Sequence, residues 1–279
     1  MLEESLQKKL IAQGRAFTHG YSDHDPYGED FESDQDLKKP QPPLVKEPMR
    51  GKDAQIALCR DFSGLAMKKD LESCFRDRRS ARIYTQEEMS LDQLSFLLWC
   101  TQGIKGIRGK KYATLRTVPC GGARHEFETY LLVRKVTGLQ PGAYHYLPME
   151  HALEYLHPVE NLEEQLSASL SGQSWAAKAN VVFYWSMVPY RAEWRYGIYA
   201  HRTALIDVGH VGENLYLGTT GLGLGTCGIA AFYDPVCNAL FELDGEDEYI
   251  VYTAPVGTVR DCDVAEEKAF YRFVEEEGL

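Results

Sequence analysis

Apolar residues recur at helical spacing in the middle of this 279-residue chain. The clearest predicted helix spans residues 90–103, where Ser90 and Gln93 fit a reciprocal capping box and Gly103 supplies the C-terminal stop. Its predicted apolar face comprises Leu91, Leu94, Leu97, Leu98 and Thr101. Leucines with a period of four predict a second, shorter helix over residues 162–170.

Other apolar runs have the alternation or the composition of strands. Alternating positions and strand-forming residues predict strands over residues 127–136, 144–147, 153–156 and 249–254. The second and third of these suit a hairpin with its turn near Met149. Residues 180–188 are almost wholly apolar and contain Val, Phe, Tyr and Trp, which predicts a strand buried on both faces.

A long helix is predicted over residues 203–222 although it contains Gly209, Gly212 and Gly218. Each glycine weakens a helix by roughly 1 kcal/mol relative to alanine. We therefore expect them to permit close packing, either against the backbone of a partner subunit or within the ordinary core.

Two further helices complete the predicted elements. Asp234 and Pro235 suit the N-cap and first position of a short helix that ends at Leu243. Residues 264–276 form an acidic amphipathic pattern that predicts a tail helix. Helices and strands mix without a regular βαβ alternation, so the predicted class is α+β.

The first 70 residues differ in composition from the rest of the chain. They are polar, with an acidic tract between Asp23 and Asp36 and a cluster of prolines that begins at Pro40. We predict an extended N-terminal arm over residues 1–70 and one folded domain over residues 71–279. The aromatic residues available to attach the arm to the domain are Phe17, Tyr21, Tyr27 and Phe31.

Charge and cysteine content narrow the function. A net charge of −11 and a pI near 5.3 argue against a general binder of nucleic acid or of anionic membranes. The seven cysteines are odd in number and lack CxxC spacing, so we expect reduced thiols and no metal site. No signal peptide or membrane span is expected, and the predicted location is the cytoplasm.

An arginine-rich stretch, residues 78–84, is the strongest candidate binding segment. Arg78, Ser80 and Arg82 would share one face of an extended segment, with Arg79 on the other. Guanidinium groups match phosphate geometry, and a serine hydroxyl adds a donor, so this face suits a small anionic ligand. The alternative is a solvated basic run at the end of a helix.

Two glycine-containing turns are candidates for contact with a planar ligand. Residues 221–225 lack the full dinucleotide-binding spacing and follow a helix, so a helix-ending turn before the small, apolar residues 226–232 is favoured. In the second turn, Gly121 and Gly122 permit close backbone approach, and Arg124 and His125 follow them. A nucleophile pair formed by Cys120 and His125 is the less favoured alternative there. His201 and His210 have no trusted metal-ligand spacing.

These pieces together resemble a known family. Residues 78–84, followed by the capped helix that ends at residues 97–103, closely resemble the opening of nitroreductase-fold flavoproteins. Within that superfamily the chain looks like the SagB-type, thiazoline oxidase-like dehydrogenases. The similarity continues, in order, through residues 115–125, 127–131, 138–144, 194–197, 207–210, 214–217 and 223–227.

The resemblance implies an α+β fold with a mainly antiparallel sheet, an intertwined homodimer and two FMN sites at the subunit interface. Arg78 and Ser80 would lie toward the phosphate and ribityl chain, with Arg79 beside them. Arg82 would face the N1/C2-carbonyl edge, where its charge stabilises reduced flavin. Residues that would line the flavin from the opposite subunit are Pro119, Cys120, Gly121 and Gly122. The loop formed by Ile229, Ala230, Ala231 and Phe232 would offer a backbone N–H to flavin N5, and Arg260 is a further phosphate candidate.

The family resemblance also implies an activity. We expect FMN to take a hydride from NAD(P)H and to pass electrons to a small acceptor, with Arg124, His125, Arg195 and Tyr196 on the substrate side. Azoline-oxidising members use a Lys-Tyr pair for proton transfer, whereas Arg195 here cannot act as a base at neutral pH. Oxidation of a peptide azoline or small metabolite therefore remains the second hypothesis, and a non-catalytic flavin-binding module is the third.

Overall fold

The computed structural model describes residues 4–18, 31–260, 269 and 272–278. Seven strands form one sheet in the order β1-β6-β5-β4-β7-β9-β8, and neighbouring strands all pair antiparallel. The strands of this sheet are β1 (Gln55–Ala57), β4 (Phe127–Val133), β5 (Gly142–Leu147), β6 (Ala152–His157), β7 (Val181–Met187), β8 (Leu224–Thr226) and β9 (Tyr249–Thr258). A separate hairpin consists of β2 (Ile104–Arg108) and β3 (Ala113–Arg116).

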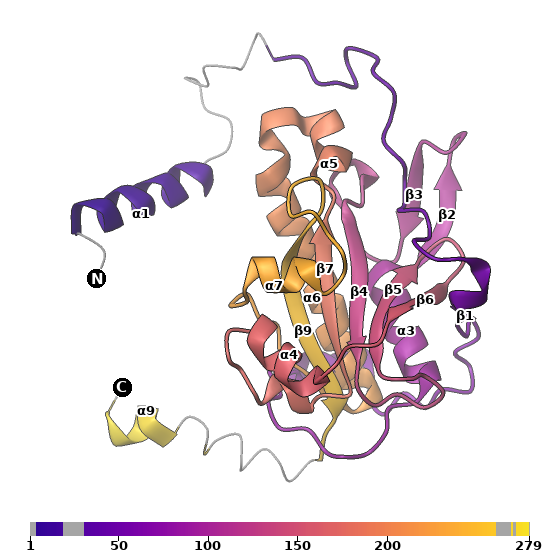
Figure 1. Ribbon diagram of the computed structural model, residues 1–279, viewed down its shortest axis with the longest axis vertical. Helices are drawn as coiled ribbons and strands as arrows, with labels where there is room; N and C mark the ends of the chain where they lie inside the picture. The colour runs from indigo at the N-terminus through magenta and orange to yellow at the C-terminus, as the bar shows by residue number, and fades with distance from the viewer. Residues whose placement is uncertain (1–3, 19–30, 261–268, 270–271, 279) are drawn as a thin grey trace.

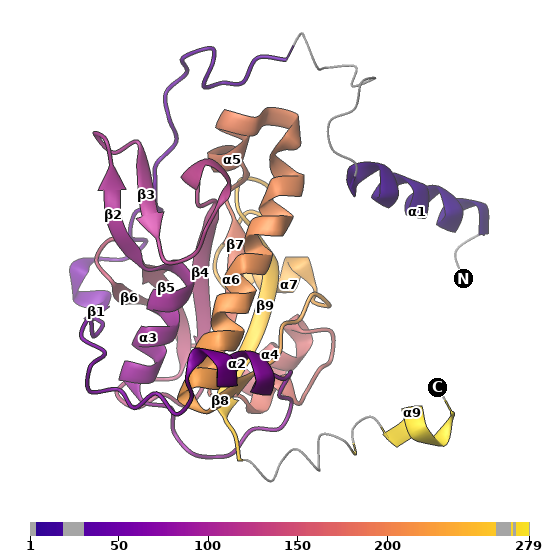
Figure 2. The same cartoon turned by 180° about the vertical axis from the view of Figure 1, so that it is seen from behind.

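Helices cover both faces of the sheet and create two hydrophobic cores. On one face lie α3 (Leu91–Gln102) and α6 (Ala200–Leu222), with α2 (Leu71–Asp77) across their ends (Figure 2). On the other face lie α4 (Leu162–Ser169), η3 (Ala176–Lys178) and α7 (Asp234–Ala239) (Figure 1). Alternate residues of β4 serve the two cores: Leu131 packs into the first and Tyr130 into the second. The α+β prediction is confirmed.

The strand and helix predictions hold for the strongest patterns. All seven residues of β7 are buried, as its apolar composition predicted. The capping box forms as predicted, since the Gln93 N–H donates to Ser90 Oγ over 3.1 Å and the Ser90 N–H to Gln93 Oε1 over 3.0 Å. The predicted hairpin is β5 with β6, and the predicted closing strand is β9, which extends to Thr258.

Some local predictions need correction. The N-cap of α7 is Tyr233 rather than Asp234, and the helix ends at Ala239 instead of Leu243. Two α6 glycines serve contacts within this chain, because an added Cβ at Gly212 would meet the Tyr252 ring and one at Gly218 would meet Cys100. Gly209 alone of the three has open space around it. Of the predicted tail helix, Arg272–Glu276 is helical (α9), and residues 264–268, 270 and 271 lie outside the described residues.

The first 70 residues include helices that the sequence pattern did not reveal. Helix α1 (Glu4–Thr18) lies apart from the body in both ribbon views (Figures 1 and 2). A turn of 3-10 helix, η1 (Lys52–Ala54), precedes β1, which pairs with β6 at the sheet edge. Of the aromatic residues expected to attach the arm, Phe31 packs edge-on against Tyr199, with ring centroids 5.8 Å apart, and Phe17 is exposed. Tyr21 and Tyr27 lie outside the described residues.

Residues 31–50, which we call the strap, cover a polar part of the second sheet face. Glu128, His145 and Glu154 are fully buried there. The backbone N–H of Lys46 donates to Glu128 over 2.8 Å, and the N–H groups of Met49 and Arg50 donate to the Glu154 carboxylate, each over 2.9 Å. Buried carboxylates thus receive their hydrogen bonds from the strap, which makes it part of the folded body.

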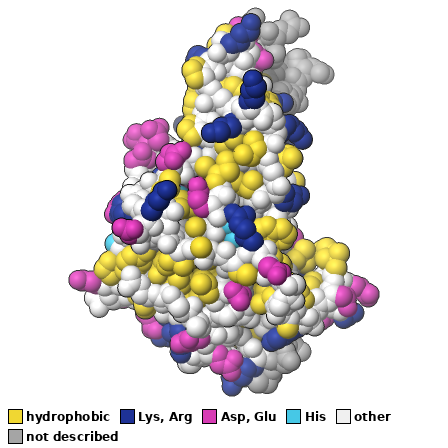
Figure 3. Space-filling model, turned by 90° about the vertical axis from the view of Figure 1, so that its right-hand side faces the viewer, with side chains coloured by type: hydrophobic (Ala, Val, Ile, Leu, Met, Phe, Trp, Pro, Cys, Tyr) yellow, Lys and Arg dark blue, Asp and Glu magenta, His cyan; other side chains and the backbone are white. Residues whose placement is uncertain are grey.

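Seen from the side of β1, β2 and β3, the surface carries hydrophobic patches with lysines and arginines among them (Figure 3). Ile107 and Leu115 are exposed hydrophobic residues of the β2–β3 hairpin. The predicted substrate-side residues Arg195 and Tyr196 lie at the end of α5 (Pro189–Tyr196). The short η4 (Gly197–Tyr199) follows α5 and leads directly into α6.

Candidate cofactor and substrate site

The arginine-rich segment leaves α2 and runs alongside β8. Its backbone pairs with that strand through a parallel bridge between Ser80 and Thr226, and the Ala81 N–H donates to the Thr226 carbonyl over 2.8 Å. Ser80 Oγ and the Tyr216 hydroxyl are 3.0 Å apart, and the Arg78 guanidinium lies over the Tyr216 ring at 5.2 Å. The structure therefore brings Arg78 and Ser80 together on one side, beside a tyrosine of α6.

Arg82 and Arg79 occupy different surroundings. The Arg82 guanidinium lies 5.8 Å from the centre of the Trp175 ring and donates to the Ser80 carbonyl over 3.4 Å. Arg79 lines a small hollow of about 60 Å³ beside the end of α6. Other polar residues around this hollow are Lys69, Asp77, Thr219, Thr220 and Thr226. The two cationic groups, Arg79 and Lys69, suit an anion, although Lys69 also pairs with Asp77 at 2.7 Å. The three threonine hydroxyls each donate to a backbone carbonyl, of Tyr216 or of Pro255.

The glycine-containing turn after α6 leads to residues that contact the same tyrosine, Tyr216. The helix ends at Leu222, and Gly223 adopts a left-handed conformation with φ of 67°. The Gly228 N–H donates to the Tyr216 hydroxyl over 2.8 Å, so the same tyrosine contacts both sides of the candidate cofactor region. In the loop that follows, Ile229 is buried against β9, and Ala230 and Ala231 are exposed with Phe232 half-buried. Arg260 is exposed after β9.

The second turn, residues 119–125, contacts α5 and α6 instead. Its centre is η2 (Gly121–Ala123), where the Gly121 N–H donates to Asp207 Oδ2 over 2.8 Å. A Cβ on Gly122, whose φ is 57°, would lie 2.5 Å from the Tyr196 hydroxyl. Glycine is therefore needed where the turn passes against α5. Pro119 is exposed at the start of the turn.

Arg124 and His125 are buried supports of this turn. The Arg124 guanidinium lies between the Tyr112 and Trp194 rings, 4.9 and 5.4 Å from their centres, and donates to the Gly122 carbonyl. Burial, then the charge of Arg116, lowers the pKa of His125 to about 2, so its imidazole stays neutral.

The geometry does not favour a Cys120–His125 nucleophile pair. His125 contacts the Cys120 sulfur through its backbone N–H, at 3.0 Å. Burial, then the charge of Glu126, raises the pKa of the Cys120 thiol. Because a nucleophilic cysteine must ionise, a buried thiol beside a carboxyl group is a poor candidate.

Arg195 and Tyr196 lie at the end of α5, beside the turn. The Arg195 guanidinium donates to the Tyr112 hydroxyl over 2.7 Å and to Gln35 Oε1 over 3.3 Å, and it lies 5.6 Å from the Tyr196 ring centre. Tyr196 is half-buried. The strap thus reaches the predicted substrate-side pair through Gln35.

The two halves of the predicted cofactor site meet α6 at different places in one chain. The arginine segment contacts Tyr216, whereas the glycine turn contacts Asp207. Nine residues of α-helix correspond to about 13 Å at 1.5 Å per residue. Within a single chain, the arginine segment and the glycine turn therefore lie apart along α6, although the resemblance to flavoproteins implies that both contact one ligand.

The chain belongs to the Nitroreductase family, whose model matches residues 75–258. It is 35% identical over 187 residues to a provisionally named nitroreductase of Methanocaldococcus jannaschii, covering 67% of this chain and 90% of that protein. A solved structure of a provisionally named nitroreductase from Anabaena variabilis is 28% identical with a TM-score of 0.57. That match covers 68% of this chain, which spans 38% of the Anabaena protein.

The fold also matches a chain of the E. coli microcin synthetase McbBCD complex, solved with truncated pro-MccB17 bound. The TM-score is 0.58 at 20% identity, and the match covers 92% of this chain and 93% of the other. At that identity the likeness shows the fold alone. Within the described parts of the chain, we find no helix that combines the length and apolarity needed to cross a bilayer.

Proposed function

We propose that this chain is an FMN-dependent oxidoreductase that passes electrons from NAD(P)H to a small acceptor, such as a nitro compound, a quinone or an enone. Bound FMN would supply hydride acceptance and electron transfer, which no side chain of the protein provides. The observation that carries the proposal is the cationic region where residues 78–82 meet the end of α6.

The donors in this region fit the polar groups of FMN. Arg79 and Lys69 line the small hollow, and their positive charges suit a phosphate. Arg78 and Ser80 would hold the adjoining polar chain beside Tyr216. Arg82 would supply fixed positive charge to the reduced ring, and Arg260 is an additional candidate for the phosphate.

We propose further that the site is completed by a second copy of the chain. The outward side of α6 exposes Leu205, Ile206 and Gly209. If two such helices crossed antiparallel about a two-fold axis near residues 211–212, Asp207 of one copy would lie opposite Tyr216 of the other. The glycine turn of one subunit would then approach the arginine segment of its partner.

An apolar groove beside α6 supports the same arrangement. It has a volume of about 470 Å³ and is lined by residues of α2, α3 and α6 that include Leu71, Phe96, Trp99 and Leu217. Leu71 is 65% exposed in the single chain. A partner subunit would remove this apolar surface from water.

The substrate-side residues favour the reductive direction. The Arg195 guanidinium is held by Tyr112 and Gln35, so it can orient an anionic or polar acceptor, but an arginine does not serve as a base. Tyr196 is the available proton donor for a reduced product. The SagB-type alternative, oxidation of a peptide azoline or small metabolite, needs a base that Arg195 does not provide.

The test is FMN affinity, measured by quenching of flavin fluorescence in titrations of the full chain. Arg82→Ala should weaken FMN binding about 10- to 100-fold, because charge-assisted hydrogen bonds contribute about 1.5–3 kcal/mol. Arg76→Ala is the matched control, since Arg76 is an exposed arginine of the preceding helix that pairs with Glu72 and Asp77. Equal affinity for the two variants, or no FMN binding by the wild type, would contradict the proposal.

A further inference from the structure

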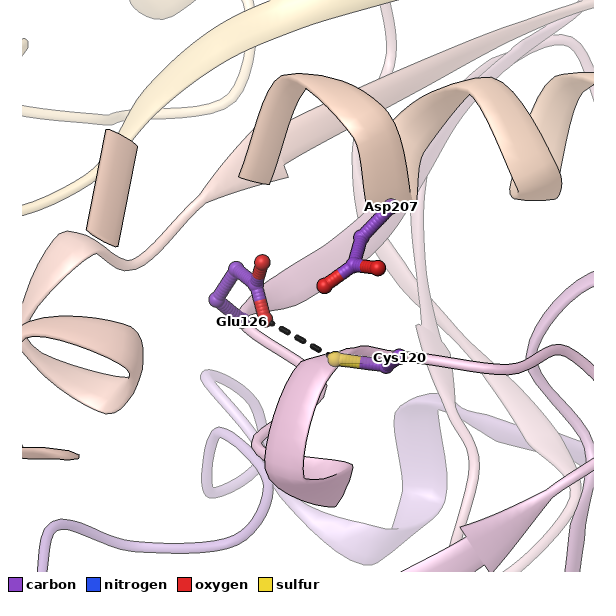
Figure 4. Close-up of side chains that lie close together, drawn as sticks. All are labelled: Cys120, Glu126 and Asp207. Carbon is purple, nitrogen blue, oxygen red and sulfur yellow. Dashed lines mark hydrogen bonds between the residues drawn. The ribbon is translucent and has the colours of Figure 1, made fainter. Parts of the chain in front are cut away.

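Three potential metal ligands lie close together beside the glycine turn, residues 119–125. Cys120 precedes η2, Glu126 precedes β4, and Asp207 lies on α6 (Figure 4). One ligand atom of each residue lies within 4.8 Å of the other two. Cys120 Sγ and Glu126 Oε2 are 3.2 Å apart, and Asp207 accepts the Gly121 N–H.

Burial makes this cluster unusual. The exposed fraction is 1% for Glu126 and 5% for Asp207. Among the described residues, Glu126 Oε1 is a buried oxygen without a hydrogen-bond partner. A buried polar atom that lacks a partner is costly, and native structures usually satisfy such an atom with protein, water or an ion.

The cationic groups near the cluster are Arg116, whose charge acts on Cys120 and Glu126, and His210. Two carboxyl groups and a thiol converge, and the His210 imidazole approaches Asp207 only to 3.8 Å from the exposed side. Burial raises the pKa of all three groups, because it disfavours their negatively charged forms. A divalent cation at this point would stabilise the charged forms.

We propose that Cys120, Glu126 and Asp207 form a binding site for one divalent cation of the zinc class. Zinc accepts both thiolate sulfur and carboxylate oxygen as ligands, whereas Mg²⁺ and Ca²⁺ prefer oxygen ligands alone. Binding forms one Zn–S and two Zn–O bonds, and the protons displaced from the thiol and from any protonated carboxyl pass to solvent. The fourth position of a tetrahedral zinc is left for water.

The required adjustment is small. Tetrahedral ligands at bond lengths of 2.0–2.3 Å lie about 3.3–3.8 Å from one another, so a pair at the 4.8 Å limit would close by about 1–1.5 Å. The ion would join the glycine turn, the start of β4 and the middle of α6. It would fix this turn whether or not flavin binds, so the proposal does not rest on the proposed function.

Zinc binding is tested on the full-length chain, stripped with a chelator and titrated with Zn²⁺ against a chromophoric competitor. The wild type should bind one Zn²⁺ per chain and release protons on binding. Glu126→Gln and Cys120→Ser should each weaken binding at least about tenfold, because even changes behind the direct ligands cost 10- to 100-fold. Cys59→Ser is the control, since Cys59 is a partly exposed thiol outside the cluster and its loss should leave the affinity unchanged.

Circular dichroism shows whether each variant is folded, and the two ligand variants serve as independent checks on each other. A folded wild type that takes up no Zn²⁺ would overturn the proposal without reference to any variant. The proposal also fails if a folded Glu126→Gln or Cys120→Ser chain binds zinc as tightly as the wild type, because the metal would then occupy another site.

Discussion

Glu154 anchors the strap to the sheet, and its replacement should release that contact. The buried carboxylate accepts three hydrogen bonds of 2.9 Å, from the N–H groups of Met49 and Arg50 and from Nδ1 of His145. Glu154→Gln keeps the shape but removes the charge and turns one acceptor oxygen into a donor. The amide nitrogen opposes at least the Arg50 N–H, and the uncharged oxygen accepts weaker hydrogen bonds from Met49 and His145.

The expected cost is about 3–5 kcal/mol, the range for removing one partner of a buried ion pair. One lost hydrogen bond to a charged acceptor, about 1.5–3 kcal/mol, together with the weakening of the other two gives a similar total. That is a large part of the roughly 5–15 kcal/mol by which a domain is stable. We expect either a loss of global stability or a local release of the strap.

Both outcomes are measurable at fixed protein concentration. Urea unfolding at pH 7 reports global stability, and hydrogen exchange at the Met49 and Arg50 amides reports the strap. Glu47→Gln is the matched control, because Glu47 is exposed on the same segment. If Glu154→Gln unfolds within about 0.5 kcal/mol of the control and keeps both amides protected, the buried-anchor reasoning is refuted.

Three further predictions concern charge, the strap and assembly. Burial alone would lower the pKa of His145, but hydrogen bonds to two buried glutamates outweigh it and raise the pKa. The stabilisation that the protonated His145 contributes is therefore fully present below about pH 6.5 and is lost as pH rises through the raised pKa. The difference in unfolding free energy between wild type and His145→Gln should thus narrow as pH rises. A difference that does not change with pH would contradict this. Gln35→Ala removes a contact to Arg195, so it should raise KM for the acceptor while FMN affinity stays unchanged; an unchanged KM would contradict this role. Ile206→Asp should shift sedimentation toward monomer and weaken FMN binding, unlike Ile107→Asp on the β2–β3 hairpin, and equal behaviour of these two variants would argue against an α6 interface.

Local physical signals were enough to predict much of the fold. The composition of β7 and the capping box of α3 reflect burial and hydrogen bonding within a few residues, and these are visible in a sequence. The strap was different, because the bond between Lys46 and Glu128 joins residues 82 positions apart. Nothing in the polar composition of residues 31–50 indicated that they cover buried carboxylates.

The candidate site likewise contains residues that the sequence indicated and residues that only the structure revealed. The concentrated charge of the arginine segment is visible in the sequence, but Lys69 has an ordinary position there and became a candidate only through the small hollow. Tyr216 was missed for the same reason, although it contacts both Ser80 and Gly228. The zinc-class site could not be found from cysteine spacing, since only one of its ligands is a cysteine. The FMN and substrate roles assigned by residue stay predictions.

The visible spectrum of the purified full-length protein, before and after anaerobic addition of NADH and of NADPH, tests the central claim most directly. We predict a flavin band near ~450 nm that bleaches with at least one nucleotide and returns on addition of an acceptor. A band that persists with both nucleotides would contradict the reductase and favour an oxidative dehydrogenase or a flavin-binding module. A colourless protein that takes up no added FMN would contradict the flavin assignment itself.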